Sequence, residues 1–110
     1  MADNKYTADL RTDQSRQRYF CEQFHQHLAL LGVESRMGPA YYGPRVYLQA
    51  PPGIKCFFTA KEIGLYVDDR GQSEASVKLA GAEFQNTRAY IIAADLHQKM
   101  LAQFYEKSRL

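Results

Sequence analysis

Cysteine and histidine are well suited to metal binding and to nucleophilic catalysis, but their spacing in this chain supports neither. Cys21 and His25 lie four residues apart, which places both on one face of a helix. A structural zinc site needs four ligands, and His27 points about 200° away from His25 on a helix. Only Cys56 and His97 remain as further ligands, and nothing nearby in the sequence would activate either thiol. We therefore expect two buried, reduced cysteines, no metal site and no cofactor.

Carboxylates and glycine-rich loops make no better case for catalysis. Asp68 and Asp69 close an apolar run, where a following Glu-x-Lys motif could hold magnesium in a nuclease. Glu74 and Lys78 have the wrong spacing for that motif, so the two aspartates are interpreted as turn-forming residues. The chain also has no glycine-rich phosphate loop and no Gly-x-Ser-x-Gly elbow. The sequence predicts that the protein is not an enzyme.

The aromatic residues give the more informative pattern, because many of them fall in strand-like segments. Three such runs cover Arg45–Ala50, Ile54–Ala60 and Ile63–Asp69. They are separated by Pro51-Pro52-Gly53 and by Lys61-Glu62, which have the lengths of short hairpin loops. The pattern predicts an antiparallel meander whose register is fixed by the loop lengths.

This register sorts the side chains onto two different faces, because successive residues of a strand point in opposite directions. One face is apolar and is the predicted packing surface for a helix; it holds Val46, Leu48, Cys56, Phe58, Leu65 and Val67. On the other face Tyr47 lies opposite Phe57, which lies opposite Tyr66. Arg45 and Lys55 flank this aromatic row, so the row and its two cations form the candidate binding surface.

Four interpretations of the aromatic row stay open. The C-terminal helix could cover it, or the three rings could stabilise a partly exposed sheet through cross-strand pairing. The row could also bind another protein or a second copy of the chain, since Tyr, Phe and Arg are enriched at interfaces. Finally, it could stack nucleic-acid bases, although a net charge of +2 and the neighbouring Asp68 weaken that analogy.

A second candidate surface is the loop that contains Tyr41 and Tyr42. Gly38-Pro39 and Gly43-Pro44 bracket the two tyrosines and stiffen the loop. A stiff loop loses little entropy when a partner binds it, which favours recognition. The alternative is that one tyrosine packs under the sheet and the other lies on the surface.

Two helices and two further strands complete the predicted elements. A helix from Asp13 carries an apolar stripe, is stopped by Gly32 and is followed by a short strand at Val33–Met37. The stripe consists of Phe20, Phe24, Leu28 and Leu31. Alternation in Glu74–Leu79 predicts an edge strand, and Asn86 or Thr87 could cap a helix that runs through Phe104.

Length and charge bound the functional class. A chain of 110 residues with a formal charge of +2 fits one domain and lacks the field of a dedicated nucleic-acid binder. We expect a flexible arm at residues 1–12 and a single α+β domain at 13–110, with an N-terminal helix, a three- to four-stranded antiparallel meander and a C-terminal helix. No apolar run is long enough to span a membrane and no signal peptide is recognisable, which predicts a cytoplasmic protein.

These patterns lead to one functional hypothesis and one alternative. The hypothesis is a non-enzymatic module that binds another protein, for instance a small inhibitor such as a phage or mobile-element anti-defence protein. A homodimer is a further partner to consider. The alternative is a nucleic-acid-binding protein that uses the aromatic face of the sheet.

Overall fold

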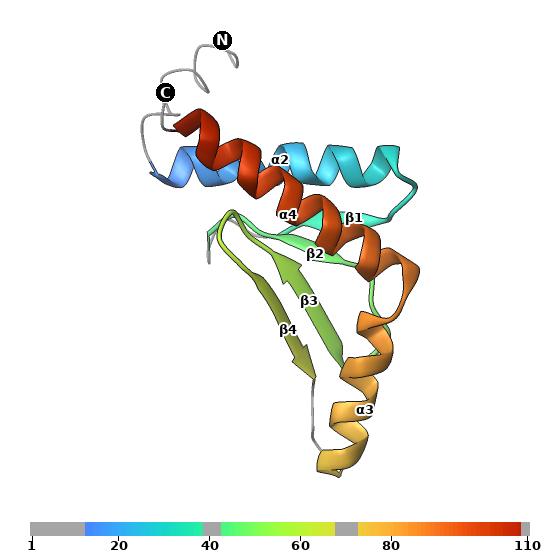
Figure 1. Cartoon of the computed structure of the whole chain (residues 1–110). Coiled ribbons are helices and arrows are strands. Elements are labelled where there is room, and N and C mark those ends of the chain that lie inside the picture. The colour runs from blue at the N-terminus through green and yellow to red at the C-terminus, as the bar shows by residue number, and fades with distance from the viewer. Residues whose placement is uncertain (1–12, 39–42, 68–72, 109–110) are drawn as a thin grey trace.

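The chain folds into one four-stranded antiparallel sheet with helices before and after it (Figure 1). The computed structural model describes residues 13–38, 43–67 and 73–108. Its elements are α2 (Asp13–Leu30), β1 (Ser35–Met37), β2 (Val46–Leu48), β3 (Ile54–Phe58), β4 (Ile63–Val67), α3 (Glu74–Gln85) and α4 (Arg88–Ser108). The predicted α+β class is confirmed. The predicted arm at 1–12 and the tyrosines Tyr41 and Tyr42 lie outside the described residues.

Helix α2 buries most of the predicted apolar stripe. Phe20, Phe24 and Leu28 are each almost fully buried, as expected for residues spaced by one helical turn. Leu31 was expected to continue the stripe but is 50% exposed, because the helix ends at Leu30 and the chain turns away. Gly32 makes this turn with a φ of +77°, and Val33 takes the next core position.

The four strands follow one another in space in the order β1-β2-β3-β4, so the sheet is a meander. The predicted short strand after α2 is β1. In the β2–β3 hairpin Val46 pairs with Phe58 and Tyr47 pairs with Phe57, as predicted. Gly53 closes this hairpin with a φ of +88°, a conformation that favours glycine.

The register of the β3–β4 hairpin differs from the prediction by two residues. The Thr59 amide donates to the carbonyl of Glu62 at 2.9 Å, and the Thr59 hydroxyl accepts from the Lys61 and Glu62 amides. Thr59 and Glu62 therefore close the hairpin, so that its two-residue loop is Ala60-Lys61 and not Lys61-Glu62. Tyr66 consequently pairs with Lys55, whereas Phe57 lies opposite Gly64. An error of two residues keeps every side chain on its predicted face.

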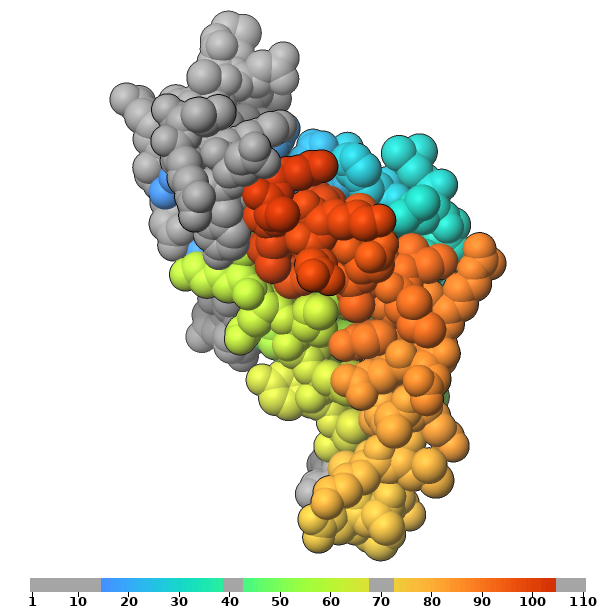
Figure 2. All heavy atoms as spheres, viewed as in Figure 1, coloured from blue at the N-terminus to red at the C-terminus, as the bar shows by residue number. Residues whose placement is uncertain are grey.

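The apolar face of the sheet carries the core. Phe58 packs against Phe24 with ring centroids 5.0 Å apart, and it also contacts Tyr90 of α4. Phe20 on α2 and Phe104 on α4 meet edge to face at 5.5 Å, which joins the two helices. Helices α2 and α4 thus cover this face together, with α3 beside them (Figure 1). In Figure 2, atoms of α3 and α4 form a continuous surface on this side of the molecule.

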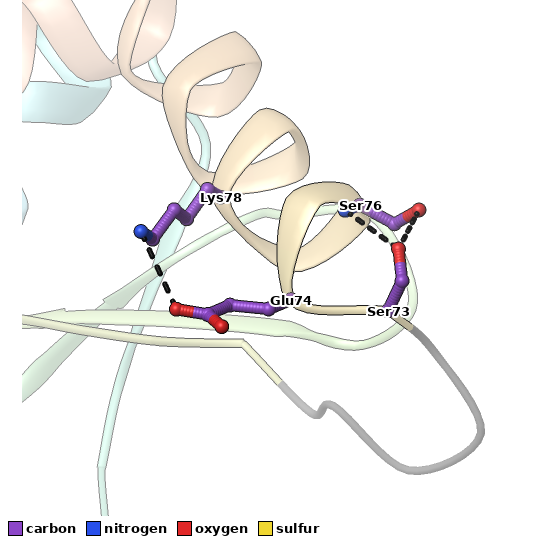
Figure 3. Close-up of polar contacts among 4 residues, drawn as sticks. All are labelled: Ser73, Glu74, Ser76 and Lys78. Carbon is purple, nitrogen blue, oxygen red and sulfur yellow. Dashed lines mark hydrogen bonds and ion pairs between the residues drawn. The ribbon is translucent and has the colours of Figure 1, made fainter.

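The segment predicted as a fourth meander strand, Glu74–Leu79, is instead the first half of helix α3. The Ser73 hydroxyl accepts a hydrogen bond from the Ser76 amide at 3.1 Å and caps the helix, as Figure 3 shows. Glu74 and Lys78, one turn apart, form an exposed ion pair at 3.4 Å. These local interactions favour the helix, and they outweigh the short alternation on which the strand prediction rested.

Helix α3 covers the end of the apolar face that α2 and α4 leave open. Its buried residues are Gly81 and Phe84, and Gly81 lies close to Val67 of β4. The hydroxyl of Thr87 then accepts from the Tyr90 amide, so Thr87 caps α4 as predicted. No helix among the described residues is long and apolar enough to cross a membrane.

Candidate functional site

The second face of the sheet presents one aligned row of side chains. Each residue of the row is the cross-strand partner of the next. Arg36 of β1 pairs with Tyr47 of β2, which also pairs with Phe57 of β3, and Phe57 in turn pairs with Gly64 of β4. Tyr66 lies diagonally next to Phe57, and the two rings stack with centroids 5.7 Å apart and an interplanar angle of 30°. The three aromatic residues therefore form a row as predicted, although Tyr66 joins it along a diagonal. We call this surface the open face, because the helices α2, α3 and α4 pack on the opposite side of the sheet (Figure 1).

Phe57 is the buried centre of the open face. Only 3% of the residue is exposed, yet it lies outside the main core cluster. Its ring lies over Gly64, where a Cβ atom would overlap the ring, so the missing side chain makes room for it. The Arg45 guanidinium lies 4.2 Å from the ring centroid, and Tyr47 meets the ring edge to face at 6.1 Å. Phe57 thus supports its neighbours and offers little surface of its own.

Tyr47 repeats this arrangement one strand away. Its ring lies over Gly38, which again has no side chain to obstruct it. The Arg36 guanidinium lies 4.6 Å from the ring centroid of Tyr47, and the Lys55 ammonium nitrogen lies 5.9 Å from it. Both distances are in the range of cation–π attraction. Each buried or half-buried ring of the open face therefore holds at least one cation in place.

A groove of about 580 Å³ lies on the open face. It is lined by Arg45, Tyr47, Gly53, Ile54, Lys55, Phe57, Tyr66 and Val67. The structure thus brings together five of the seven predicted binding residues, which come from β2, β3, β4 and the residue just before β2. Tyr66 is the most exposed of the three aromatic residues, at 61%. The other two predicted residues, Tyr41 and Tyr42, cannot be placed relative to the groove because they lie outside the described residues.

The sequence prediction missed Arg36, which contributes a third cation to this face. Arg36 lies on β1 directly opposite Tyr47 and is exposed. The signal was available, because Arg36 lies in the predicted strand Val33–Met37, where alternation places it on the face opposite to its two neighbours. These neighbours, Ser35 and Met37, face the helices.

The two cysteines are buried and free. Desolvation raises the pKa of Cys21 to about 12, with a further contribution from the charge of Glu22. Desolvation alone raises the pKa of Cys56 to about 12. Thiols with such pKa values are protonated at neutral pH and are poor nucleophiles. Among the described residues no group of three or more His, Cys, Asp or Glu side chains could hold a metal ion.

The other residues singled out by their chemistry have structural partners. His25 hydrogen-bonds the Ser35 hydroxyl at 2.7 Å, and His27 hydrogen-bonds the backbone carbonyl of Gln23. His97 is 3% exposed and donates from Nε2 to the Thr59 carbonyl at 2.8 Å. These contacts fit a role in holding the fold together.

Comparison with known protein families, with characterised proteins and with solved structures finds no match for this chain.

Proposed function

We propose that this chain is a cytoplasmic, non-enzymatic module that binds another protein through the open face of its sheet. The observation that supports the proposal most directly is that five predicted binding residues line one groove. They are Arg45, Tyr47, Lys55, Phe57 and Tyr66. Tyr and Arg are the residue types that dominate interface hot spots, and they act best when the partner fills a shaped pocket. A small inhibitor that blocks a surface of its target needs no more than such a face.

The preorganisation of the face supports this proposal. The ring of Phe57 is fixed between Gly64, Tyr47, Tyr66 and the guanidinium of Arg45. Side chains that are already ordered lose less entropy when a partner binds. The exposed Tyr66 can then contribute contact area at low cost.

The alternative, nucleic-acid binding by base stacking, is less well supported. Base stacking requires an aromatic ring with an accessible face. Phe57 is 3% exposed, and Tyr47 already carries cations over its ring. Among the three described rings of the row, Tyr66 alone is largely exposed, which is fewer than the two or three stacking positions of typical RNA-binding sheets.

Site-specific photo-cross-linking tests the proposal in the cells that naturally produce the protein. A photoreactive phenylalanine analogue replaces Tyr66 on the open face in one variant. In a control variant it replaces Tyr19, a 41% exposed tyrosine on α2 on the other side of the sheet. We expect a protein adduct from position 66 that survives nuclease treatment and is absent from position 19. Adducts made of nucleic acid, or the same proteins captured from both positions, would contradict the proposal.

A further inference from the structure

We infer that the partner segment bound by the open face is acidic, with carboxylates of an extended stretch seated against Arg36 and Lys55. This inference rests on the proposed function and specifies the chemistry of the partner.

The charge of the groove is the first argument. The described residues that line it include two cations, Arg45 and Lys55, and no carboxylate, and Arg36 lies next to Tyr47 on the neighbouring strand. The whole chain carries only +2, with 14 basic and 12 acidic residues. Three cations gathered around one row of rings are therefore a local feature, and complementary charge steers a partner and fixes its register.

The second argument is how the cations are held. The guanidinium groups of Arg36 and Arg45 lie 4.6 Å and 4.2 Å from the ring centroids of Tyr47 and Phe57. A guanidinium that lies over a ring still presents N–H donors, and these match the two oxygens of a carboxylate. Arg36 and Lys55 form no ion pair with any residue in the described part of the chain. These two exposed cations are thus available to a partner.

A second copy of this chain fits the groove poorly. A symmetric dimer places the same patch of both copies face to face. Arg36 and Lys55 of one copy would then lie near the same cations of the other, with no carboxylate among the described residues that line the groove to compensate. Like charges brought together at an interface oppose association. The occupant that complements this face is an acidic segment of another protein.

Fluorescence anisotropy with a defined probe tests this inference. The probe is a labelled peptide of alternating glutamate and serine, in which an extended conformation points every glutamate to one side. The reference probe has glutamine in place of glutamate, and a single-stranded oligouridylate of the same length reports on nucleic acid. The test variant is Arg36→Gln/Lys55→Gln. The control variant, Lys78→Gln/Lys99→Gln, removes the same charge from exposed positions on α3 and α4.

We expect the glutamate probe to bind with a dissociation constant below about 1 mM, and the glutamine probe at least about tenfold more weakly. Arg36→Gln/Lys55→Gln should weaken binding of the glutamate probe by about tenfold or more, whereas the control variant stays within about twofold of the unmodified protein. Equal thermal stability of the two variants would show that the weaker binding does not come from a damaged fold.

Other results separate the two proposals. If the glutamate probe does not bind, or binds no better than the glutamine probe, the acidic partner is excluded. The proposed function still stands in that case if position 66 cross-links to a protein. If oligouridylate binds more tightly than the glutamate probe and Arg36→Gln/Lys55→Gln abolishes its binding, both the acidic partner and the proposed function are wrong.

Discussion

At the scale of single residues, His97 shows how a polar group can be placed in an apolar core. Its ring lies among Phe20, Phe24 and Phe58 at centroid distances of 5.4 to 5.8 Å. The hydrogen bond from Nε2 to the Thr59 carbonyl satisfies one ring nitrogen and ties α4 to the end of β3. Burial lowers the pKa of His97 below its ordinary value of 6.5, because the charged form would lose its hydration. The histidine therefore stabilises the fold in its neutral form.

Stability should accordingly fall in mild acid. Below pH 6.5 the unfolded chain takes up a proton at His97 before the folded chain does, so the free energy of unfolding decreases until the folded pKa is reached. Each pH unit in this window costs up to about 1.4 kcal/mol. Urea unfolding between about pH 7.5 and about pH 5 measures the slope. In His97→Gln the slope should be smaller, and equal slopes in both proteins would show that His97 is not held neutral.

The two faces of the sheet should respond differently to truncation of an aromatic residue. Phe58 is fully buried against Phe24 and Tyr90, so Phe58→Ala should cost about 3 to 5 kcal/mol of unfolding free energy. Tyr66 is 61% exposed, so Tyr66→Ala should cost less than about 1 kcal/mol. Chemical denaturation of both variants makes the comparison. A larger loss for Tyr66→Ala would mean that the assignment of the two faces is reversed.

At the scale of elements, the sequence was sufficient wherever one periodic pattern dominated. The stripe of Phe20, Phe24 and Leu28 specified α2, and the short loop before Ile54 specified the β2–β3 register. The β3–β4 register was wrong because the side chain and backbone of Thr59 move the turn back by one residue, a local hydrogen-bond pattern that hydrophobic alternation does not show.

Helix α3 was mistaken for a strand for a related reason. Alternation of Ala75, Val77 and Leu79 suggested an edge strand, but Leu79 is 60% exposed. Over a longer window the less exposed positions are Val77, Ala80, Gly81 and Phe84, which have helical spacing. The burial of Phe57 also could not be predicted, because it depends on the ring lying over Gly64 on a neighbouring strand.

The cap of α3 provides a test at this scale. Ser73→Ala removes the acceptor for the Ser76 amide and should lower the unfolding free energy by about 0.5 to 2 kcal/mol. Ser73→Asp keeps an acceptor next to the helix N-terminus. Its unfolding free energy should therefore stay within a few tenths of a kcal/mol of that of the unmodified protein. Urea unfolding followed by circular dichroism measures both. Equal stability of all three proteins would show that the cap at Ser73 does not stabilise this helix.

At the scale of the whole molecule, one sheet separates two environments. On one side, α2, α3 and α4 cover an apolar face and exclude water from it. On the other side, the rings of Tyr47 and Phe57 lie close to glycines and carry cations, so the open face is ordered although no described helix covers it. Substitutions on the open face can therefore change binding without disturbing the core on the covered face. The two cysteines, on α2 and β3, both lie in the covered layer and report on its integrity.

The thiols should be protected together and exposed together. Cys21 and Cys56 are fully buried with pKa values of about 12, so raising the pH to about 9, which activates an ordinary thiol, should not make them react with iodoacetamide in the folded protein. Because both lie in one core, global unfolding should expose them at the same urea concentration. Pulsed alkylation across a urea series, read by mass spectrometry of the two cysteine-containing peptides, measures each site separately.

Labelling of Cys21 at lower urea than Cys56 would show that α2 leaves the sheet before the rest of the core unfolds. A free-thiol peptide labelled in the same solutions corrects for any effect of urea on the reagent, so coincident midpoints would establish that the helices and the sheet unfold as one cooperative unit.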